Sequence, residues 1–148
     1  MGTEIERKFL VVGDTWRVGA VGKRYCQGYI RAQGTATVRV RTVEQTGYLT
    51  LKGPTSGVSR LEFEYEIPFE DADQILRTLC DRPLIEKVRY LITHDGLQWE
   101  VDEFLGENQG LIMAEIELTD PKQSFPHPQW LGQEVSDDGR YFNSNLAT

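Results

Sequence analysis

The sequence has few of the residues from which many active sites are built. Its 148 residues include only two cysteines and two histidines. Cys26 and Cys80 lack the spacing of a zinc site, which favours reduced thiols in a cytoplasmic protein over a disulfide. His94 and His127 lie far apart in turn-like segments, and neither is assigned a role. The sequence contains no P-loop and no Ser-His-Asp set, so Walker-type and triad mechanisms have no support.

Long apolar runs and a surplus of positive charge are also missing. No stretch approaches the roughly 20 apolar residues that span a bilayer, and the acidic, strand-like N-terminus does not resemble a signal peptide. The formal net charge is −7, whereas proteins that bind nucleic acid need excess Lys and Arg. We therefore expect neither a membrane nor a nucleic acid as partner. A small anion is still a candidate ligand, because a local cationic cluster can bind phosphate within an acidic protein.

What the chain does have is charge on alternate residues, first seen in Glu4-Ile5-Glu6-Arg7-Lys8. Successive side chains of a strand point to opposite faces, so Glu4, Glu6 and Lys8 would share one face. Neighbouring carboxylates repel each other unless a cation lies between them, and a hard metal ion with oxygen ligands meets that need. For this segment alone, an ordinary solvated charged face is the favoured interpretation, because the pattern is short and common.

The same pattern recurs along the chain, and its charges are sorted by sign. Basic pairs occur at Arg39/Arg41 and Lys87/Arg89, while acidic pairs occur at Glu62/Glu64, Glu100/Asp102 and Glu115/Glu117. A solubilising surface needs charge but not this strand-by-strand sorting. Basic pairs suit phosphate oxygens, and acidic pairs suit divalent metals. Together they indicate a site for a metal-bound polyphosphate.

Alternating segments joined by turn residues predict a mainly β, antiparallel protein with a single domain over residues 1–148. We expect strands at 3–11, 24–32, 36–43, 48–53, 59–68, 86–95, 97–105 and 112–119. A helix is expected from Asp71 to Cys80, with Ile75, Leu76 and Leu79 on one face. The tail from Pro121 onward is interpreted as short helices or turns packed over a barrel mouth or wall.

About eight antiparallel strands can close into a barrel, and two arrangements then fit the alternation. Charges could face solvent around an apolar core, which is the commoner architecture. Alternatively, charges could line a hydrated tunnel whose apolar outer faces are covered by the helix and the tail. Periodicity does not choose between them, but the sorting of the charge pairs favours the tunnel.

The ordered motifs resemble the CYTH domain, also called the triphosphate tunnel metalloenzyme family. They run from Glu4 to about Leu146 and include Glu4-Ile5-Glu6-Arg7-Lys8, Arg39-Val40-Arg41, Leu51-Lys52-Gly53, Arg60-Leu61-Glu62-Phe63-Glu64, Lys87-Val88-Arg89, Ala114-Glu115-Ile116-Glu117-Leu118 and the tail segment Arg140-Tyr141-Phe142-Asn143. The resemblance implies an eight-stranded antiparallel barrel that binds a triphosphate inside, and so selects the tunnel.

The resemblance also implies roles for individual residues. Phosphate oxygens would be bound by Lys8, Arg39, Arg41, Lys52, Lys87 and Arg89. One or two Mg²⁺ or Mn²⁺ ions, two being the expectation, would be held by Glu4, Glu6, Glu115 and Glu117. Further metal candidates are Glu62, Glu64, Glu100 and Asp102, and the alternative for these four is that they pair with tunnel cations. Catalysis would depend most on Glu4, Glu6, Lys8 and Glu117. Gln27 and Tyr29 would contact substrate or fill the tunnel end, and Arg60 and Glu66 would lie at the rims.

The implied activity is metal-dependent hydrolysis of a triphosphate, with inorganic triphosphate preferred because the recognisable features bind only a phosphate chain. Thiamine triphosphatase and adenylate cyclase activity are the alternatives within the family. A non-catalytic module that binds polyphosphate or nucleotide is the alternative outside it. Pairing of two copies through an outer apolar face is a further expectation.

Overall fold

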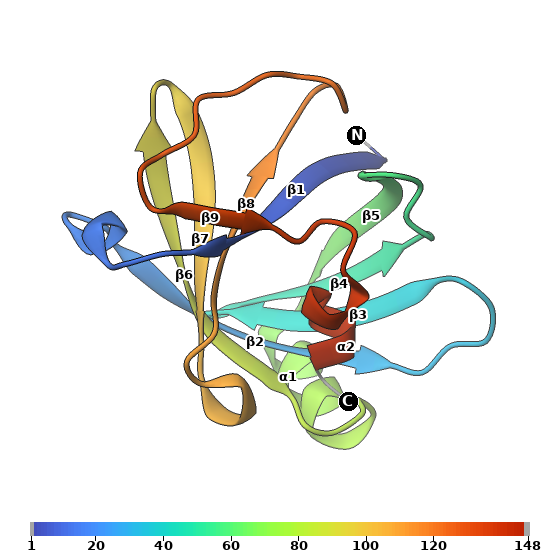
Figure 1. Cartoon of the computed structure of the whole chain (residues 1–148). Coiled ribbons are helices and arrows are strands. Elements are labelled where there is room, and N and C mark those ends of the chain that lie inside the picture. The colour runs from blue at the N-terminus through green and yellow to red at the C-terminus, as the bar shows by residue number, and fades with distance from the viewer. Residues whose placement is uncertain (1, 147–148) are drawn as a thin grey trace.

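Nine antiparallel β-strands form one sheet in the computed structural model, which describes residues 2–146 (Figure 1). The strands are β1 (Thr3–Val11), β2 (Gly22–Ile30), β3 (Thr37–Val43), β4 (Thr46–Lys52), β5 (Ser59–Ile67), β6 (Ile85–His94), β7 (Leu97–Phe104), β8 (Ile112–Glu117) and β9 (Leu131–Glu134). Their order is β5-β4-β3-β2-β6-β7-β8-β1-β9. An additional pairing between β1 and β5 closes the first eight strands into a barrel. The predicted eight-stranded antiparallel barrel is therefore confirmed.

The ninth strand lies in the tail, where no strand was predicted. One edge of β1 pairs with β5 at residues 3–5 and with β9 at residues 9–11. Leu131-Gly132-Gln133-Glu134 is too short to show an alternating pattern, so the sequence gives little sign of it. Gly132 allows the close pairing, because a Cβ atom there would lie 2.8 Å from the carbonyl oxygen of Leu10.

Helix α1 (Phe69–Thr78) begins directly after Pro68, earlier than predicted. Ala72 and Leu76, one turn apart, are buried against β3 and β4. The prediction that Leu79 shares the buried face is wrong: Leu79 is the C-terminal cap and its side chain is 63% exposed. Gly47 permits the close contact between helix and sheet, because a Cβ there would lie 2.7 Å from the Cβ of Ala72.

The outer wall of the barrel is apolar but only partly covered. Over β1, β7 and β8, the turn η1 (Thr15–Arg17) contributes Trp16 and the tail contributes Phe125 and Trp130 to a buried aromatic cluster. Helix α1 covers β3 and β4. The expected cover is missing over β5, where Phe63 and Tyr65 are exposed. None of the described helices has the length and apolar character to cross a bilayer.

Inside the barrel, charge and apolar packing occupy different regions. Ile85, Phe104 and Met113 each lie two residues from an inward-pointing charged residue of the same strand. They therefore also point inward, and they form a buried cluster. Tyr141 of η3 (Gly139–Tyr141) and Leu146 of α2 (Asn143–Leu146) pack against this cluster. The interior is therefore not a uniformly hydrated tunnel, because an apolar plug that the tail completes fills part of it. The remaining short element is η2 (Gly106–Asn108).

Candidate active site

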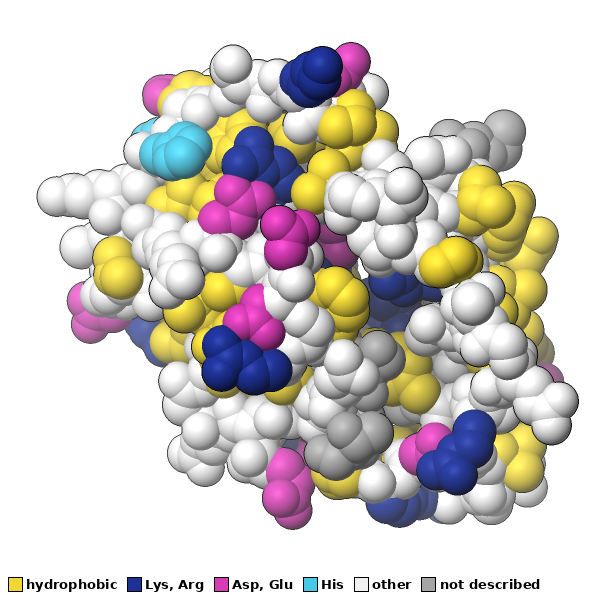
Figure 2. All heavy atoms as spheres, turned by 45° about the vertical axis from the view of Figure 1, so that its right-hand side comes forward, with side chains coloured by type: hydrophobic (Ala, Val, Ile, Leu, Met, Phe, Trp, Pro, Cys, Tyr) yellow, Lys and Arg dark blue, Asp and Glu magenta, His cyan; other side chains and the backbone are white. Residues whose placement is uncertain are grey.

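The charged part of the barrel interior is a cavity of about 240 Å³. Figure 2 shows a hollow on this side of the molecule with Lys and Arg side chains deep inside it. Every predicted phosphate-binding residue lines the cavity, as do most of the predicted metal ligands. The lining includes Lys8, Arg39, Arg41, Lys52, Lys87, Arg89, Glu4, Glu6, Glu62, Glu64, Glu100, Glu115 and Glu117.

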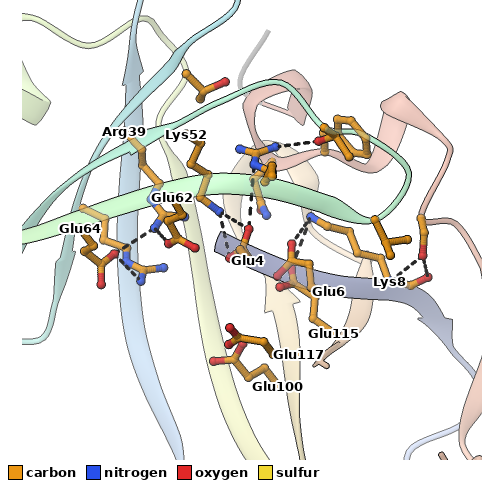
Figure 3. A pocket seen from close by; sticks show the side chains of 18 of the residues that line it. Glu4, Glu6, Lys8, Arg39, Lys52, Glu62, Glu64, Glu100, Glu115 and Glu117 are labelled. Carbon is orange, nitrogen blue, oxygen red and sulfur yellow. Dashed lines mark hydrogen bonds and ion pairs between the residues drawn. The ribbon is translucent and has the colours of Figure 1, made fainter. Parts of the chain in front are cut away.

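Strand alternation and register bring these side chains together. On β1, Glu4, Glu6 and Lys8 point inward, while Ile5 and Phe9 join the outer apolar cluster. The pairing of β1 with β8 sets Glu6 opposite Glu117 and Lys8 opposite Glu115. Figure 3 shows the labelled acidic and basic side chains converging from several strands on one space. The basic strand β6 pairs with the acidic strand β7, and Lys52 of β4 lies opposite Glu62 of β5, whereas β8 lies between the acidic residues of β1 and β7.

A buried ion cluster joins β6 and β7. Asp102 accepts hydrogen bonds from Lys87 Nζ at 2.8 Å and from Arg89 Nε and Nη2 at 2.7 and 2.8 Å. Lys87 and Asp102 are each 1% exposed. Burial and repulsion by Arg89 lower the pKa of Lys87 to about 8. Despite its own burial, Asp102 has a pKa below the ordinary value, because Arg89 and Lys87 stabilise its charge.

Asp102 does not itself line the cavity, unlike the other predicted metal ligands. Both of its carboxylate oxygens accept hydrogen bonds from cations of the same sheet. Glu100, two residues earlier, lines the cavity and accepts a hydrogen bond from Arg89 at 3.1 Å. Burial raises the pKa of Glu100, although Arg89 opposes this effect. The position of Asp102 suits holding Lys87 and Arg89 in place more than reaching a ligand.

A second cluster forms around one oxygen of Glu64. Glu64 Oε2 accepts hydrogen bonds from Arg39 at 3.2 Å, from Arg41 at 3.2 Å and from Thr50 Oγ1 at 2.8 Å. Burial, Arg39 and Arg89 together lower the pKa of Arg41. Donors that converge on a single carboxylate oxygen are also arranged to bind an oxygen of a phosphate.

The acidic residues of β1 and β8 are crowded. Burial raises the pKa of Glu6 to about 8, and the nearby charge of Glu115 adds to the effect. Lys8 Nζ lies 3.8 Å from Glu6 and 3.5 Å from Glu115. Burial disfavours the charged form of Lys8, but Glu115 and Glu6 outweigh it and raise the pKa. Near the start of β1, Glu4 accepts a hydrogen bond from Lys52 Nζ at 3.2 Å.

The described residues form no ready-made metal centre. Among residues 2–146, no group of three His, Cys, Asp or Glu side chains stands close enough together to hold an ion. The carboxylates instead turn toward cations, as the Glu4–Lys52 and Glu115–Lys8 pairs show. Carboxylates that pair with tunnel cations would need to change partners to bind a metal. The metal ligands therefore stay a prediction.

Some lining residues were not predicted, and three of them, Ser136, Phe142 and Asn143, come from the tail. Ser136 accepts a hydrogen bond from the backbone N–H of Lys8 at 2.9 Å, and the Lys8 ammonium lies 5.7 Å from the centre of the Phe142 ring. Asn143 also lines the cavity. Arg60, predicted for the rim, lines the cavity and lies 3.9 Å from Glu4. The tail motif was noticed in the sequence, but it has no alternation that would aim its side chains at a site.

Comparison with known proteins identifies the family. Residues 2–144 match the CYTH domain family model, which covers the strands, the cavity and most of the tail. The chain belongs to the CYTH domain family. It is 55% identical over 147 residues to an inorganic triphosphatase of Acetivibrio thermocellus, covering 99% of this chain and 94% of that protein.

Two further matches agree with this one. An inorganic triphosphatase of Nitrosomonas europaea is 36% identical over 150 residues, covering 98% of this chain and 97% of the relative. A crystal structure of the inorganic triphosphatase NE1496 superposes with a TM-score of 0.69 at 32% identity, covering 99% of this chain and 95% of that chain. The resemblance inferred from the ordered motifs is confirmed, and the CYTH barrel of this chain carries its charges on the inside.

Proposed function

We propose that this CYTH protein hydrolyses inorganic triphosphate to diphosphate and phosphate with the help of a divalent cation. The observation that carries the proposal is the convergence of buried and half-buried Lys and Arg side chains from β1, β3, β4, β5 and β6 on one small cavity that carboxylates also line. A short, highly charged anion matches such a lining, because each phosphate can receive several charge-assisted hydrogen bonds. The names of the related triphosphatases support the same substrate.

Binding would proceed by exchange of partners within the cavity. Arg39 and Arg41 would release Glu64 and donate to phosphate oxygens instead, and Lys52 would release Glu4. Arg89 has hydrogen-bonding groups beyond those that Asp102 occupies, so it can bind phosphate while staying anchored. Phosphoryl transfer needs positioning and charge neutralisation more than covalent help. These cations supply both for the leaving diphosphate.

The acidic residues fit a hard divalent ion by their chemistry. Glu6 and Glu117 face each other across β1 and β8, and Glu115 lies next to them in the register. Carboxylate oxygens are the ligands that Mg²⁺ and Mn²⁺ prefer. We propose Glu4, Glu6, Glu115 and Glu117 as the residues that would hold one or two such ions, with Glu62 and Glu64 as further candidates. When bound, the metal would neutralise phosphate charge and acidify a water.

Measurement of phosphate release tests the proposal directly. The protein is incubated with inorganic triphosphate, ATP or thiamine triphosphate, each with Mg²⁺, with Mn²⁺ or with excess EDTA. We expect release from inorganic triphosphate to be fastest and to stop in EDTA. Glu117→Gln should lower kcat by at least about 100-fold, the scale of losing one important electrostatic group. Undiminished release in EDTA would refute the metal requirement, and triphosphate binding without any release would support the non-catalytic module.

Two finer features belong to the proposal. Cys26 and Cys80 form no disulfide although both contact the cluster under α1, which supports a cytoplasmic setting.

The exposed apolar stripe of Leu61, Phe63 and Tyr65 on β5 supports pairing of two copies, because an uncharged stripe can pack against itself without burying charge. Light scattering coupled to gel filtration measures the mass, and a monomer at high concentration would refute the pairing.

A further inference from the structure

Gln27 on β2 is buried inside the barrel, and its side chain makes one hydrogen bond among the described residues. Its side chain is 0% exposed, and its Nε2 donates to the hydroxyl oxygen of Tyr29 at 2.9 Å. Its other polar atom, Oε1, is buried and has no partner among the described residues. A fully buried amide with an unsatisfied oxygen costs stability. An apolar residue of similar size would fill the same space more cheaply, which points to a role for the amide beyond packing.

The neighbouring strand explains which way the amide faces. Gln27 lies opposite Arg41 in the β2–β3 pairing. The Nε of Arg41 is also a buried atom without a partner in the described part of the chain. An acceptor on Gln27 and a donor on Arg41 complement each other, and one bound water could satisfy both. The opposite amide orientation would place donors against donors, so this register favours Nε2 pointing toward Tyr29.

This hydrogen bond controls the direction of the Tyr29 proton. The Tyr29 oxygen accepts from Gln27, so its own O–H must point to a different acceptor. Within residues 2–146, Tyr29 donates no hydrogen bond to the protein. Its ring packs against the apolar plug, yet Tyr29 also lines the charged cavity. Lys8 lines the same cavity.

We propose that Gln27 is a positioning residue that turns the Tyr29 hydroxyl hydrogen toward the cavity, where it donates to an oxygen of the bound triphosphate beside Lys8. The proposal rests on the proposed function for its substrate. Gln27 itself does not line the cavity, so it acts through Tyr29 rather than by touching the phosphate chain. It forms a link between the packed part of the barrel interior and the charged part.

A double-mutant cycle tests this role. Gln27→Met keeps the length of the side chain and removes both polar atoms, and Tyr29→Phe removes only the hydroxyl. For triphosphate hydrolysis we expect Tyr29→Phe to lower kcat/KM by about 10- to 100-fold, the range for a hydrogen bond to a charged group. Gln27→Met should lower it by about 5- to 10-fold. The double variant should match Tyr29→Phe within about twofold, because without the hydroxyl the amide has nothing to orient.

Controls separate this role from a structural one. Gln74→Met on the exposed face of α1 should leave kcat/KM unchanged. Melting temperatures report folding, and Gln27→Asn, which is too short to reach the hydroxyl, replaces Gln27→Met if the latter does not fold. Calorimetric titration of inorganic triphosphate in Ca²⁺ gives the same cycle for binding even if no variant, including the wild type, releases phosphate. Three results would each overturn the proposal. The first is a double variant whose loss in kcat/KM is the product of the two single losses, the second is a Gln27→Met variant with the kcat/KM of the wild type, and the third is a wild type that does not bind triphosphate.

Discussion

A single buried carboxylate, that of Asp102, accounts for the presence of two cations in the barrel wall. Lys87 and Arg89 both donate to it, and all three side chains are buried. Two adjacent buried cations without a counter-charge would repel each other and lose hydration. Asp102 makes the basic pair tolerable without a ligand, and it leaves Nη1 of Arg89, which donates to Glu100, on the side of the cavity.

Replacement of Asp102 by Asn should therefore destabilise the protein before any ligand is added. Breaking a buried ion pair typically costs about 3–5 kcal/mol, so urea unfolding without metal should show a loss of that size. Asp73→Asn is the matched control, because Asp73 pairs with Arg77 on the exposed side of α1. That change should cost less than about 1 kcal/mol. If Asp102→Asn keeps full stability without metal and loses only metal affinity, Asp102 is a metal ligand as the resemblance implied.

At the scale of elements, α1 lies close to the sheet because the two residues in contact, Gly47 of β4 and Ala72 of α1, are small. Gly47→Ala would place a Cβ 2.7 Å from the Cβ of Ala72. Overpacking of this kind typically costs about 1–3 kcal/mol. Urea unfolding should show this loss for Gly47→Ala, and the double change with Ala72→Gly should recover part of it. Equal stability of Gly47→Ala and the wild type would show that the helix can move away freely.

The same helix shields the thiol of Cys26. Burial raises the pKa of Cys26 to about 11 from an ordinary value of 9.0, and the charge of Glu86 adds to the shift. The folded protein should be stabilised by the neutral thiol below pH 9, and this contribution should decline as the pH rises toward 11. At pH 8, iodoacetamide should react with Cys26 about 100-fold more slowly than in urea, because the thiolate is the reactive form. Equal rates in the folded and unfolded protein would contradict the shift.

Strands were easier to predict than the parts between and beyond them. Alternating charged and apolar residues placed β1, β5 and β6 nearly at their observed bounds, because a side-chain period of two is a direct signature of a strand. Strand β9 and the tail residues Ser136, Phe142 and Asn143 have no such period. Their positions depend on contacts with β1 and with the plug, which are distant in sequence, so local pattern could not reveal them.

At the scale of the whole molecule, the barrel interior is a balanced set of charges. The sorting of basic and acidic pairs predicted this, since neither sign could be buried alone. What the sorting could not show is which cations have a strong partner. Arg89 is held by Asp102, and its pKa is raised well above its ordinary value. Arg41 shares Glu64 with Arg39, and its pKa is lowered by burial and by Arg39 and Arg89.

This inequality predicts opposite effects of two similar changes. Arg41→Ala should leave the empty protein at least as stable as the wild type, because it relieves repulsion between cations. Arg89→Ala should destabilise the empty protein, because Asp102 would lose its strongest partner. Both variants should bind triphosphate about 10- to 150-fold more weakly, the effect of losing a hydrogen bond to a charged group. Thermal unfolding with and without triphosphate, in Ca²⁺ to limit turnover, measures stability and binding together.

Ligand at 100 times its Kd should stabilise the wild type by about 2.7 kcal/mol by mass action. If Kd rises 100-fold, the same concentration should give only about 0.4 kcal/mol. Arg24→Ala is the control, because Arg24 lies outside the cavity and is largely exposed, and its ligand-induced shift should equal that of the wild type. Equal shifts in Arg41→Ala, Arg89→Ala and Arg24→Ala would mean that triphosphate does not bind among these cations. A loss of stability in Arg41→Ala as large as in Arg89→Ala would refute the inequality between the two arginines, because it would show that Glu64 holds Arg41 as firmly as Asp102 holds Arg89.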